Sequence, residues 1–355
     1  MKFVPLTVQA LIHETEDAYT LQFENPDPAT FAYKPGQYLT LKVTYQGESL
    51  RRAFSLSSCP DQDPHLSVTI KAVPNGRVSN YLRQHLKPGD TIEVFPPMGK
   101  FTLSPDAGQA RHYVLIGGGS GITPLFSILQ SVLLKEPQSQ VTLLYANRNE
   151  RSIIFGSRLA ELERQSGGRL QVVHVLDKPL AAWDGPTGML TRPLAMDLLG
   201  QIKAKSELPT EYYMCGPTPM MDAVLAALHR MGEDEANIHR EYYTAPLPDE
   251  ETAEEDSGEV DYELRDREVS IRLDGKTTRV AVPAGTNILD AAIGARLDPP
   301  YACQEGICST CRAKVHSGLV QMVEREGLSD EEVEAGYVLT CQCYPLTDDV
   351  ALEYC

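Results

Sequence analysis

The sequence has no long apolar run and no excess of basic residues, and each absence excludes a class of protein. None of its 355 residues lie in a stretch approaching the ~18–20 apolar residues of a bilayer crossing, so we expect no membrane span. The segment from Met1 to Pro5 lacks a signal-peptide apolar core, which predicts a cytoplasmic, reducing location. With 49 acidic and 32 basic residues, the net charge of −17 argues against nucleic-acid binding, which needs a basic patch.

The chain also lacks an internal repeat, a G-x-G-x-x-G dinucleotide fingerprint, and a convincing nucleophile or general acid–base pair. Its negative charge is concentrated towards the C-terminus. Residues 245–261 carry −8, and residues 262–355 hold 16 acidic and 9 basic side chains. An acidic C-terminal part can be steered towards a basic protein partner, although such acidity also simply favours solubility.

Composition and periodicity divide the chain into three domains and a linker. Residues 1–107 contain short strands between turn signals, which is typical of an antiparallel sandwich or barrel. Residues 108–244 alternate strands with helices and predict a doubly wound α/β domain on a parallel sheet. The acidic, proline-containing residues 245–261 hold few large apolar side chains and predict a flexible linker. Residues 262–355 predict a small α+β domain.

Four cysteines form the most specific pattern in the sequence. Cys303, Cys308 and Cys311 are spaced C-x4-C-x2-C, and Cys341 follows after a further 29 residues. This is the plant-type ferredoxin spacing for a [2Fe–2S] cluster held by four thiolates. A zinc site is a weaker interpretation because Cys341 and Cys343 are too close for a second C-x2-C knuckle, and disulfides require an oxidising compartment. Cys343 points to the same face of a strand as Cys341 and remains an alternative fourth ligand.

A flavin site is indicated in the first domain by the stretch R-x-F-S at residues 52–55. The arginine suits a pyrophosphate, the phenylalanine offers a ring face, and the serine hydroxyl can hydrogen-bond flavin N5. A second stretch, beginning at Gly76, opens a helix whose free N–H groups suit an anion. Alone, R-x-F-S also fits an ordinary amphipathic strand. The residues that we expect to bind this cofactor are Tyr38, Arg52, Ala53, Phe54, Ser55, Lys71, Gly76, Val78 and Ser79.

A pyridine nucleotide site is indicated in the second domain. The apolar strand at residues 114–116 runs into a glycine-rich turn and then a helix, which allows close backbone approach to a pyrophosphate. Cys215 also follows a strand, at the edge where open α/β sheets bind ligands, although a free cysteine is often only a small buried apolar residue. The residues that we expect to bind the nucleotide are Gly118, Gly119, Ser120, Gly121, Thr123, Arg148, Cys215, Gly216 and Pro217.

The choice between NADPH and NADH depends on the loop after the second strand of this domain. Arg148 and Arg151 can hold a 2′-phosphate, whereas Glu150 can accept from the ribose hydroxyls of NADH. Exposed loop arginines are also often merely solvated. The sequence favours NADPH.

Taken together, these stretches resemble the ferredoxin–NADP reductase superfamily over essentially the entire chain. The resemblance rests on residues 34–38 (K-P-G-Q-Y), 52–55, 76–82 (G-R-V-S-N-Y-L), 117–124 (G-G-G-S-G-I-T-P) and 215–217 (C-G-P). With the ferredoxin domain last, the arrangement is similar to the reductase components of multicomponent oxygenases, of the phenylacetyl-CoA epoxidase and ketosteroid 9α-hydroxylase type. It implies a multidomain fold: an antiparallel FAD-binding β-barrel, a parallel-sheet nucleotide domain and a β-grasp ferredoxin domain.

The resemblance also implies functional roles for particular residues. Phe54 and Ser55 would act at the flavin, Cys215 would lie beside the nicotinamide, and Tyr242, in place of the more usual Phe, would lie near the isoalloxazine. Cys303, Cys308, Cys311 and Cys341 would bind the cluster.

The three cofactors predict one electron path. Nicotinamide gives up two electrons as a hydride, a [2Fe–2S] cluster accepts one, and a flavin handles both. We therefore expect an NAD(P)H-dependent reductase that feeds a partner oxygenase. The alternatives are a reductase for another one-electron acceptor, such as a hybrid-cluster protein or desaturase, and a redox-sensing protein without turnover.

Overall fold

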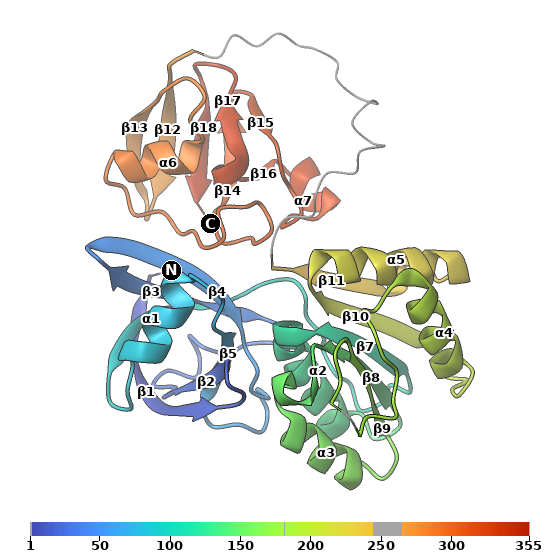
Figure 1. The fold of residues 1–355 in the computed structure, drawn as a ribbon. Helices are drawn as coiled ribbons and strands as arrows, with labels where there is room; N and C mark the ends of the chain where they lie inside the picture. Colours follow the sequence, from blue (N-terminus) through green and yellow to red (C-terminus); the bar gives the residue numbers. More distant parts are fainter. Residues whose placement is uncertain (1, 181, 244–264, 355) are drawn as a thin grey trace. The chain divides into compact units, whose positions relative to one another are not determined.

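The computed structural model describes residues 2–180, 182–243 and 265–354, and the chain divides into two compact units (Figure 1). Unit 1 spans Met1–Tyr243 and unit 2 spans Thr244–Cys355. Each unit is described by itself. The linker predicted at residues 245–261 lies outside the described residues.

The first half of unit 1 is an antiparallel β-barrel. Its six strands are ordered β4-β3-β6-β1-β2-β5, and a bridge between Leu56 and Val68 joins the two outer strands, which closes the sheet. Apolar side chains from all six strands, together with Val78 and Leu82 of the single helix, fill the interior. The elements are β1 (Val4–His13), β2 (Ala18–Phe23), β3 (Tyr38–Tyr45), β4 (Glu48–Ser55), β5 (Leu66–Lys71), α1 (Arg77–His85) and β6 (Thr91–Met98).

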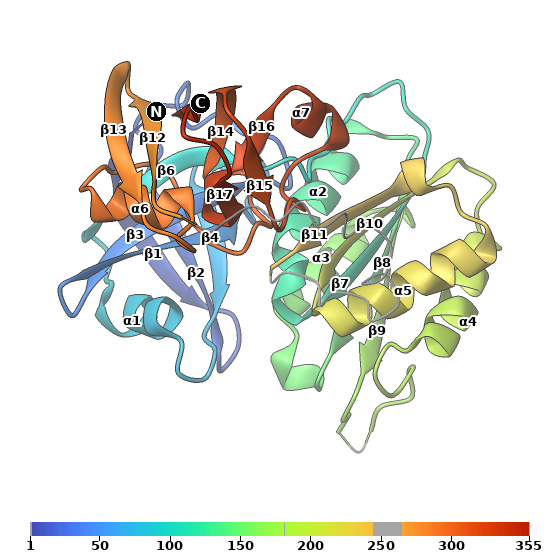
Figure 2. The same ribbon diagram turned by 90° about the horizontal axis from the view of Figure 1, so that it is seen from above.

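The second half of unit 1 is a parallel sheet with helices on both faces (Figure 2). One apolar core holds the inner faces of α2 and α3, and a second core holds those of α4 and α5. The strand order β11-β10-β7-β8-β9 reverses direction between β7 and β10, so their carboxyl ends flank the crevice where such sheets bind ligands. The elements are β7 (His112–Gly118), α2 (Ile122–Lys135), β8 (Gln140–Asn147), α3 (Gly156–Gln165), β9 (Leu170–Leu176), α4 (Arg192–Lys203), β10 (Thr210–Gly216), α5 (Thr218–Met231) and β11 (Ile238–Tyr242).

Unit 2 is a small α+β fold. A mixed sheet ordered β13-β12-β18-β14-β16 packs against α6, and β15 pairs with β17 in a separate ribbon. Its first hairpin turns through Asp274 and Gly275, which both have positive φ (50° and 77°), as a two-residue type I′ turn requires. The elements are β12 (Arg267–Leu273), β13 (Lys276–Val282), α6 (Ile288–Gly294), β14 (Arg312–Ser317), β15 (Val320–Met322), α7 (Asp330–Glu334), β16 (Tyr337–Leu339), β17 (Cys343–Pro345) and β18 (Ala351–Tyr354).

The predicted fold class is confirmed by these sheets: an antiparallel barrel, a parallel α/β sheet and a small α+β unit with the cysteine pattern. None of the helices in the described part of the chain combines the length and apolar character that a bilayer crossing needs.

Buried hydrogen bonds join the two halves of unit 1. On α2, the Ser127 hydroxyl donates to the Ser58 carbonyl at 2.6 Å, and the Gln130 amide donates to the Ser57 carbonyl at 3.2 Å. Ser131 lies 3.5 Å from the Cys59 thiol. All of these side chains are buried. Because α2 starts at the glycine-rich turn and residue 57 follows R-x-F-S closely, these bonds fix the position of one predicted site relative to the other.

We expect Ser127→Ala to lower the free energy of unfolding of unit 1 by about 1–3 kcal/mol, because the buried Ser58 carbonyl loses its donor. Urea unfolding followed by the fluorescence of Trp183, the only tryptophan in the chain, reports on this unit alone. The matched control is Ser157→Ala on α3, where the serine is exposed and little change is expected. Equal stability of the two variants would contradict a structural role for these interdomain hydrogen bonds.

Candidate functional site

Side chains from both halves of unit 1 meet where β4 and β11 end. The Ser55 hydroxyl donates to the Glu241 carboxyl at 3.3 Å and lies 3.2 Å from the Tyr243 hydroxyl. The Tyr243 hydroxyl also lies 2.8 Å from the Thr123 hydroxyl, at the start of α2. Ser55 is buried at the end of a barrel strand, whereas the other three residues belong to the α/β half. We call Ser55, Thr123, Cys215, Glu241 and Tyr243 the hydroxyl–carboxyl cluster.

Cys215 completes this cluster at the end of β10. It is fully buried. Burial, and then the nearby charge of Glu241, raise the pKa of the Cys215 thiol well above its usual value, while a hydrogen bond with Tyr243 opposes the shift. The thiol is therefore neutral at physiological pH and is no thiolate nucleophile.

Glu241 has an unusual protonation state for a carboxyl. Desolvation raises its pKa to about 8, and the hydrogen bond from Ser55 acts in the opposite direction. The side chain therefore holds a proton at neutral pH. Neutral Glu241 beside neutral Cys215 therefore adds no net charge to the cluster.

The glycine-rich turn passes very close to β10. A Cβ on Gly121 would come 2.0 Å from the Cys215 carbonyl oxygen. Only glycine permits this approach. It brings the start of α2 to the carboxyl edge of the sheet, where backbone N–H groups suit a pyrophosphate.

The predicted flavin residues lie mostly around the open end of the barrel. Tyr38 is buried and pairs with Ser55 across β3 and β4, and Phe54 is half-buried against the barrel core. Arg52 is exposed, and its guanidinium donates to the Arg51 carbonyl at 2.7 Å. Ala53 pairs with Thr40 between these strands.

Two further predicted contacts lie beside this strand pair. At the start of α1, a Cβ on Gly76 would come 2.5 Å from Ser79 Oγ, so the Ser79 side chain would have to shift, and Val78 is buried. Lys71, at the end of β5, forms an ion pair with Asp17 at 3.6 Å. Its amine would lie only 3.9 Å from a Cβ on Gly119, so this barrel residue reaches the nucleotide loop. These positions fit an extended dinucleotide that needs a cation, anion-binding N–H groups and a buried ring face.

In the loop after β8, the Glu150 side chain binds the backbone of a neighbouring loop. Both carboxylate oxygens of Glu150 lie 3.1 Å from the Leu180 amide nitrogen, which donates to them. The Lys178 amide donates to the Arg148 carbonyl at 2.7 Å, while the Arg148 side chain is exposed. The carboxylate that could accept from a ribose thus also holds Leu180.

The last strand of unit 1 differs in detail from the sequence-based expectation. Tyr242 packs against the core on the α4 and α5 side, whereas Tyr243, which the sequence analysis did not select, contacts Ser55 and Thr123. Glu241 was also missed. Strand alternation was the available signal, because residues 241 and 243 share one face and residue 242 takes the other.

In unit 2 the four predicted cysteines lie together as two pairs. Cys311 Sγ lies 3.4 Å from Cys341 Sγ, and the thiols of Cys303 and Cys308 are hydrogen-bonded to each other. In each pair that bond lowers the pKa of one thiol, that of Cys308 to about 6 and that of Cys341 also below its usual value, and raises the pKa of its partner, Cys303 or Cys311. Among the described residues no three ligand-type side chains converge on one point. Two pairs are the donor set that two irons need.

The loop backbone around these thiols is tightly folded. Gly306 has φ of +77°, and a Cβ there would come 2.5 Å from Glu324 Cγ. The Glu305 amide lies 3.3 Å from Cys303 Sγ, and the Gly327 amide donates to the Gly306 carbonyl at 2.8 Å. The Glu305 N–H directed at the Cys303 sulfur favours a thiolate there, so this loop fits a [2Fe–2S] cluster.

Cys343, the alternative fourth ligand, belongs to a different part of the core. Its fully buried side chain packs with the main-sheet core beside α6, whereas Cys341 packs with Cys311 and Leu339. This separation favours Cys341.

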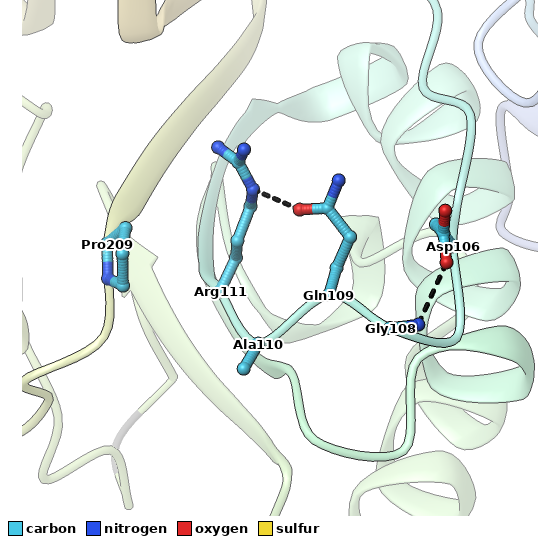
Figure 3. A pocket seen from close by; sticks show the side chains of 6 residues that line it. All are labelled: Asp106, Gly108, Gln109, Ala110, Arg111 and Pro209. Atoms are coloured by element: carbon cyan, nitrogen blue, oxygen red, sulfur yellow. Dashed lines mark hydrogen bonds between the residues drawn. The ribbon is translucent and has the colours of Figure 1, made fainter.

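A pocket of about 430 Å³ lies far from these groups in the topology of the sheet (Figure 3). Asp106, residues 108–111 and Pro209 line it. These residues precede β7 and β10, so the pocket lies at the amino edge of the sheet, opposite Gly118 and Gly216. The Arg111 guanidinium in it donates to Gln109 and pairs with Glu211. The pocket is thus separate from the predicted nucleotide site.

Three family models match the chain in succession. They are an oxidoreductase FAD-binding domain at residues 5–103, an oxidoreductase NAD-binding domain at residues 115–226, and a 2Fe-2S iron-sulfur cluster binding domain at residues 271–346. FAD, a pyridine nucleotide and a [2Fe–2S] cluster are therefore the cofactors.

Similar proteins match over nearly their full lengths. The chain is 37% identical to a component of the 1,2-phenylacetyl-CoA epoxidase of Escherichia coli (99% of this chain and 98% of that protein). It is also 37% identical to the 3-ketosteroid-9-alpha-monooxygenase ferredoxin reductase component of Rhodococcus rhodochrous (99% and 97%).

Among solved structures, phthalate dioxygenase reductase superimposes with a TM-score of 0.60 at 22% identity over 99% of this chain and 98% of that one, a likeness in fold. The predicted family, cofactors and enzyme class are confirmed. The chain belongs to the ferredoxin–NADP reductase superfamily, as an NAD(P)H-dependent flavin/iron–sulfur oxidoreductase with a C-terminal [2Fe–2S] ferredoxin domain.

Proposed function

We propose that this reductase takes electrons from NADPH and delivers them singly to a partner oxygenase, such as a phenylacetyl-CoA epoxidase or a ring hydroxylase. The relatives with these partners match the whole chain. The observation that carries the proposal is the meeting of Ser55 from the flavin half with Cys215 and Glu241 from the nucleotide half. When bound, the cofactors supply hydride transfer followed by single-electron transfer.

Within this proposal, the hydroxyl–carboxyl cluster orients the two rings. On cofactor binding, Ser55 would turn its hydroxyl hydrogen from Glu241 to the flavin, and Glu241, which holds a proton at neutral pH, would donate to the Ser55 oxygen in return. Neutral Cys215 gives the nicotinamide an apolar neighbour, and Tyr243 closes the position between Ser55 and Thr123. Because the side chains of this cluster are uncharged, they do not favour the oxidised or the reduced form of either ring before the hydride is transferred.

The remaining predicted residues hold the ends of the cofactors. Arg52 and the N–H groups after Gly76 would bind the FAD pyrophosphate, and the glycine-rich turn would bind that of the nucleotide. Cys303, Cys308, Cys311 and Cys341 would bind the cluster. The corresponding domains are an FAD domain at 1–107, a nucleotide domain at 108–244, an acidic linker at 245–261 and a ferredoxin domain at 262–355.

NADPH is favoured by the contacts of the β8 loop. Glu150 accepts from the Leu180 amide, which leaves Arg148 and Arg151 as the charged groups of the loop for a 2′-phosphate. We further propose a cytoplasmic location, where free thiols persist. A non-oxygenase acceptor is the second candidate.

Anaerobic titration with NADPH is expected to bleach the flavin absorbance and then produce the EPR signal of a reduced [2Fe–2S] cluster. In Cys341→Ser the cluster signal should be lost or strongly altered while flavin bleaching persists. Cys343→Ser is the matched control and should retain the signal. Loss of the signal in the control alone would reassign the fourth ligand, and flavin bleaching without any cluster signal in the parent protein would refute the electron path.

The raised pKa of Glu241 predicts a pH dependence. Its carboxyl is neutral below about pH 8 and ionises above it. A negative charge there opposes delivery of a hydride, so the rate of flavin bleaching by NADPH in rapid mixing should fall as pH rises through 8. Glu241→Gln should be flat over pH 6–9, whereas Glu161→Gln, on the surface of α3, should behave as the parent.

The same shift has a consequence for stability. Because the folded-state pKa lies above the unfolded value, ionisation opposes folding, and stability relative to Glu241→Gln is full at low pH and is lost as pH rises from about 4.5 towards 8. A constant difference between the two proteins across this range would contradict the assignment.

Arg148→Ala is expected to raise KM for NADPH roughly 10- to 100-fold, because charge-assisted hydrogen bonds to the 2′-phosphate, worth about 1.5–3 kcal/mol, are lost. KM for NADH should not change. The control is Arg164→Ala, whose side chain on α3 is 75% exposed. Steady-state reduction of ferricyanide measures both constants. A parallel rise in both KM values would show that Arg148 does not read the 2′-phosphate.

A further inference from the structure

Three adjacent strands of unit 2 bring a threonine and a tyrosine to one pair of cysteines. β14 begins directly after Cys311, and β16 ends directly before Thr340. Tyr354 is the last residue of β18, and it pairs with Ala313 on β14. β14 lies between β18 and β16 (Figure 1). The three residues therefore meet at one end of the sheet.

Thr340 ties together the two segments that carry the Cys311–Cys341 pair. Its amide and its hydroxyl both donate to the Cys311 carbonyl, at 3.3 Å and 3.0 Å. The next residue is Cys341, and its sulfur lies 3.4 Å from Cys311 Sγ. Thr340 is fully buried, so water does not replace these bonds. The threonine thus sets the separation of two thiols that come from distant parts of the sequence.

Tyr354 controls the direction of the Thr340 hydroxyl. Its phenol donates to Thr340 Oγ1 at 3.0 Å. Since the single hydroxyl hydrogen of Thr340 is directed to the Cys311 carbonyl, the oxygen is free to accept from Tyr354. The two hydrogen bonds form a buried chain from the Tyr354 phenol through Thr340 to the Cys311 carbonyl, in which each bond polarises the next.

We propose that Tyr354 is a positioning residue for the iron–sulfur cluster, which acts through Thr340 to hold the Cys311–Cys341 pair. The proposal rests on the proposed assignment of these cysteines as ligands. The hydrogen-bond chain withdraws electron density from the Cys311 carbonyl, and hydrogen bonding near the cluster is one determinant of its reduction potential. Without the phenol oxygen, the carbonyl carries more negative charge, which disfavours the reduced cluster.

A packing role makes a different prediction. The Tyr354 ring belongs to the apolar core of the main sheet and is only 8% exposed. Phenylalanine retains that ring, so a residue that only fills space tolerates Tyr354→Phe without change at the cluster. Removal of the Tyr354 phenol oxygen therefore distinguishes a positioning role from a packing role.

The experiment compares Tyr354→Phe, Thr340→Val, Thr340→Ser and the double variant Tyr354→Phe/Thr340→Val in the full-length holoprotein. The matched control is Tyr337→Phe on β16, whose ring lies against Arg312 and Lys314 at 5.0 Å and 4.8 Å. The readouts are the EPR spectrum of the reduced cluster, its midpoint potential, and the half-life of its visible absorbance in a chelator. Flavin bleaching by NADPH is recorded in each protein.

We expect Thr340→Val to change the EPR spectrum, lower the potential and shorten the half-life several-fold. Tyr354→Phe should cause smaller changes in the same directions, Thr340→Ser should resemble the parent, and the double variant should equal Thr340→Val, because Tyr354 acts through the threonine. Additive effects, or a Tyr354→Phe protein with the spectrum and potential of the control, would overturn the proposal. A parent protein without a cluster signal would instead refute the ligand assignment.

Discussion

The close passage of the Gly121 backbone over the Cys215 carbonyl is the constraint on which unit 1 depends. No side chain fits there, and the contact brings the start of α2 against β10. Further along the same helix, Ser127 and Gln130 donate to barrel carbonyls. One helix therefore contacts both the carboxyl edge of the parallel sheet and the barrel segment that follows β4, the strand of the predicted flavin residues. A shift of α2 would separate Thr123 from Tyr243, which also contacts Ser55 of the barrel.

The cofactor chemistry explains why no nucleophile or general acid–base pair was found in the sequence. Cofactors perform the electron transfers, so the side chains need only bind and orient them. Burial keeps Glu241 and Cys215 neutral by raising the pKa of both. In unit 2 the requirement is different, because thiolates are needed, and the Glu305 N–H of a tightly folded loop is directed at the Cys303 sulfur. The two units thus use opposite electrostatic strategies for their cofactors.

Several residues mark the limit of prediction from sequence. The glycine-rich turn and C-x4-C-x2-C were recognisable because their function depends on backbone geometry and spacing within a short segment. Glu241 and Tyr243 were not, since their significance arises only where β11 meets a barrel strand nearly 190 residues earlier in the chain. Glu150 remains only a predicted ribose acceptor, and its bond to the Leu180 amide joins two loops whose proximity no local pattern encodes.

The sequence by itself determined the family, the three domain types and the cofactors, because each depends on residue identity within continuous stretches of chain. Tertiary structure alone decided which aromatic residue of the last strand of unit 1 faces the barrel. It also decided that the cysteines form two pairs, and that Thr340 and Tyr354 support one of them. The physical reason is that burial and hydrogen-bond partners across a sheet are set by strand order and register, which bring together residues that the sequence keeps far apart.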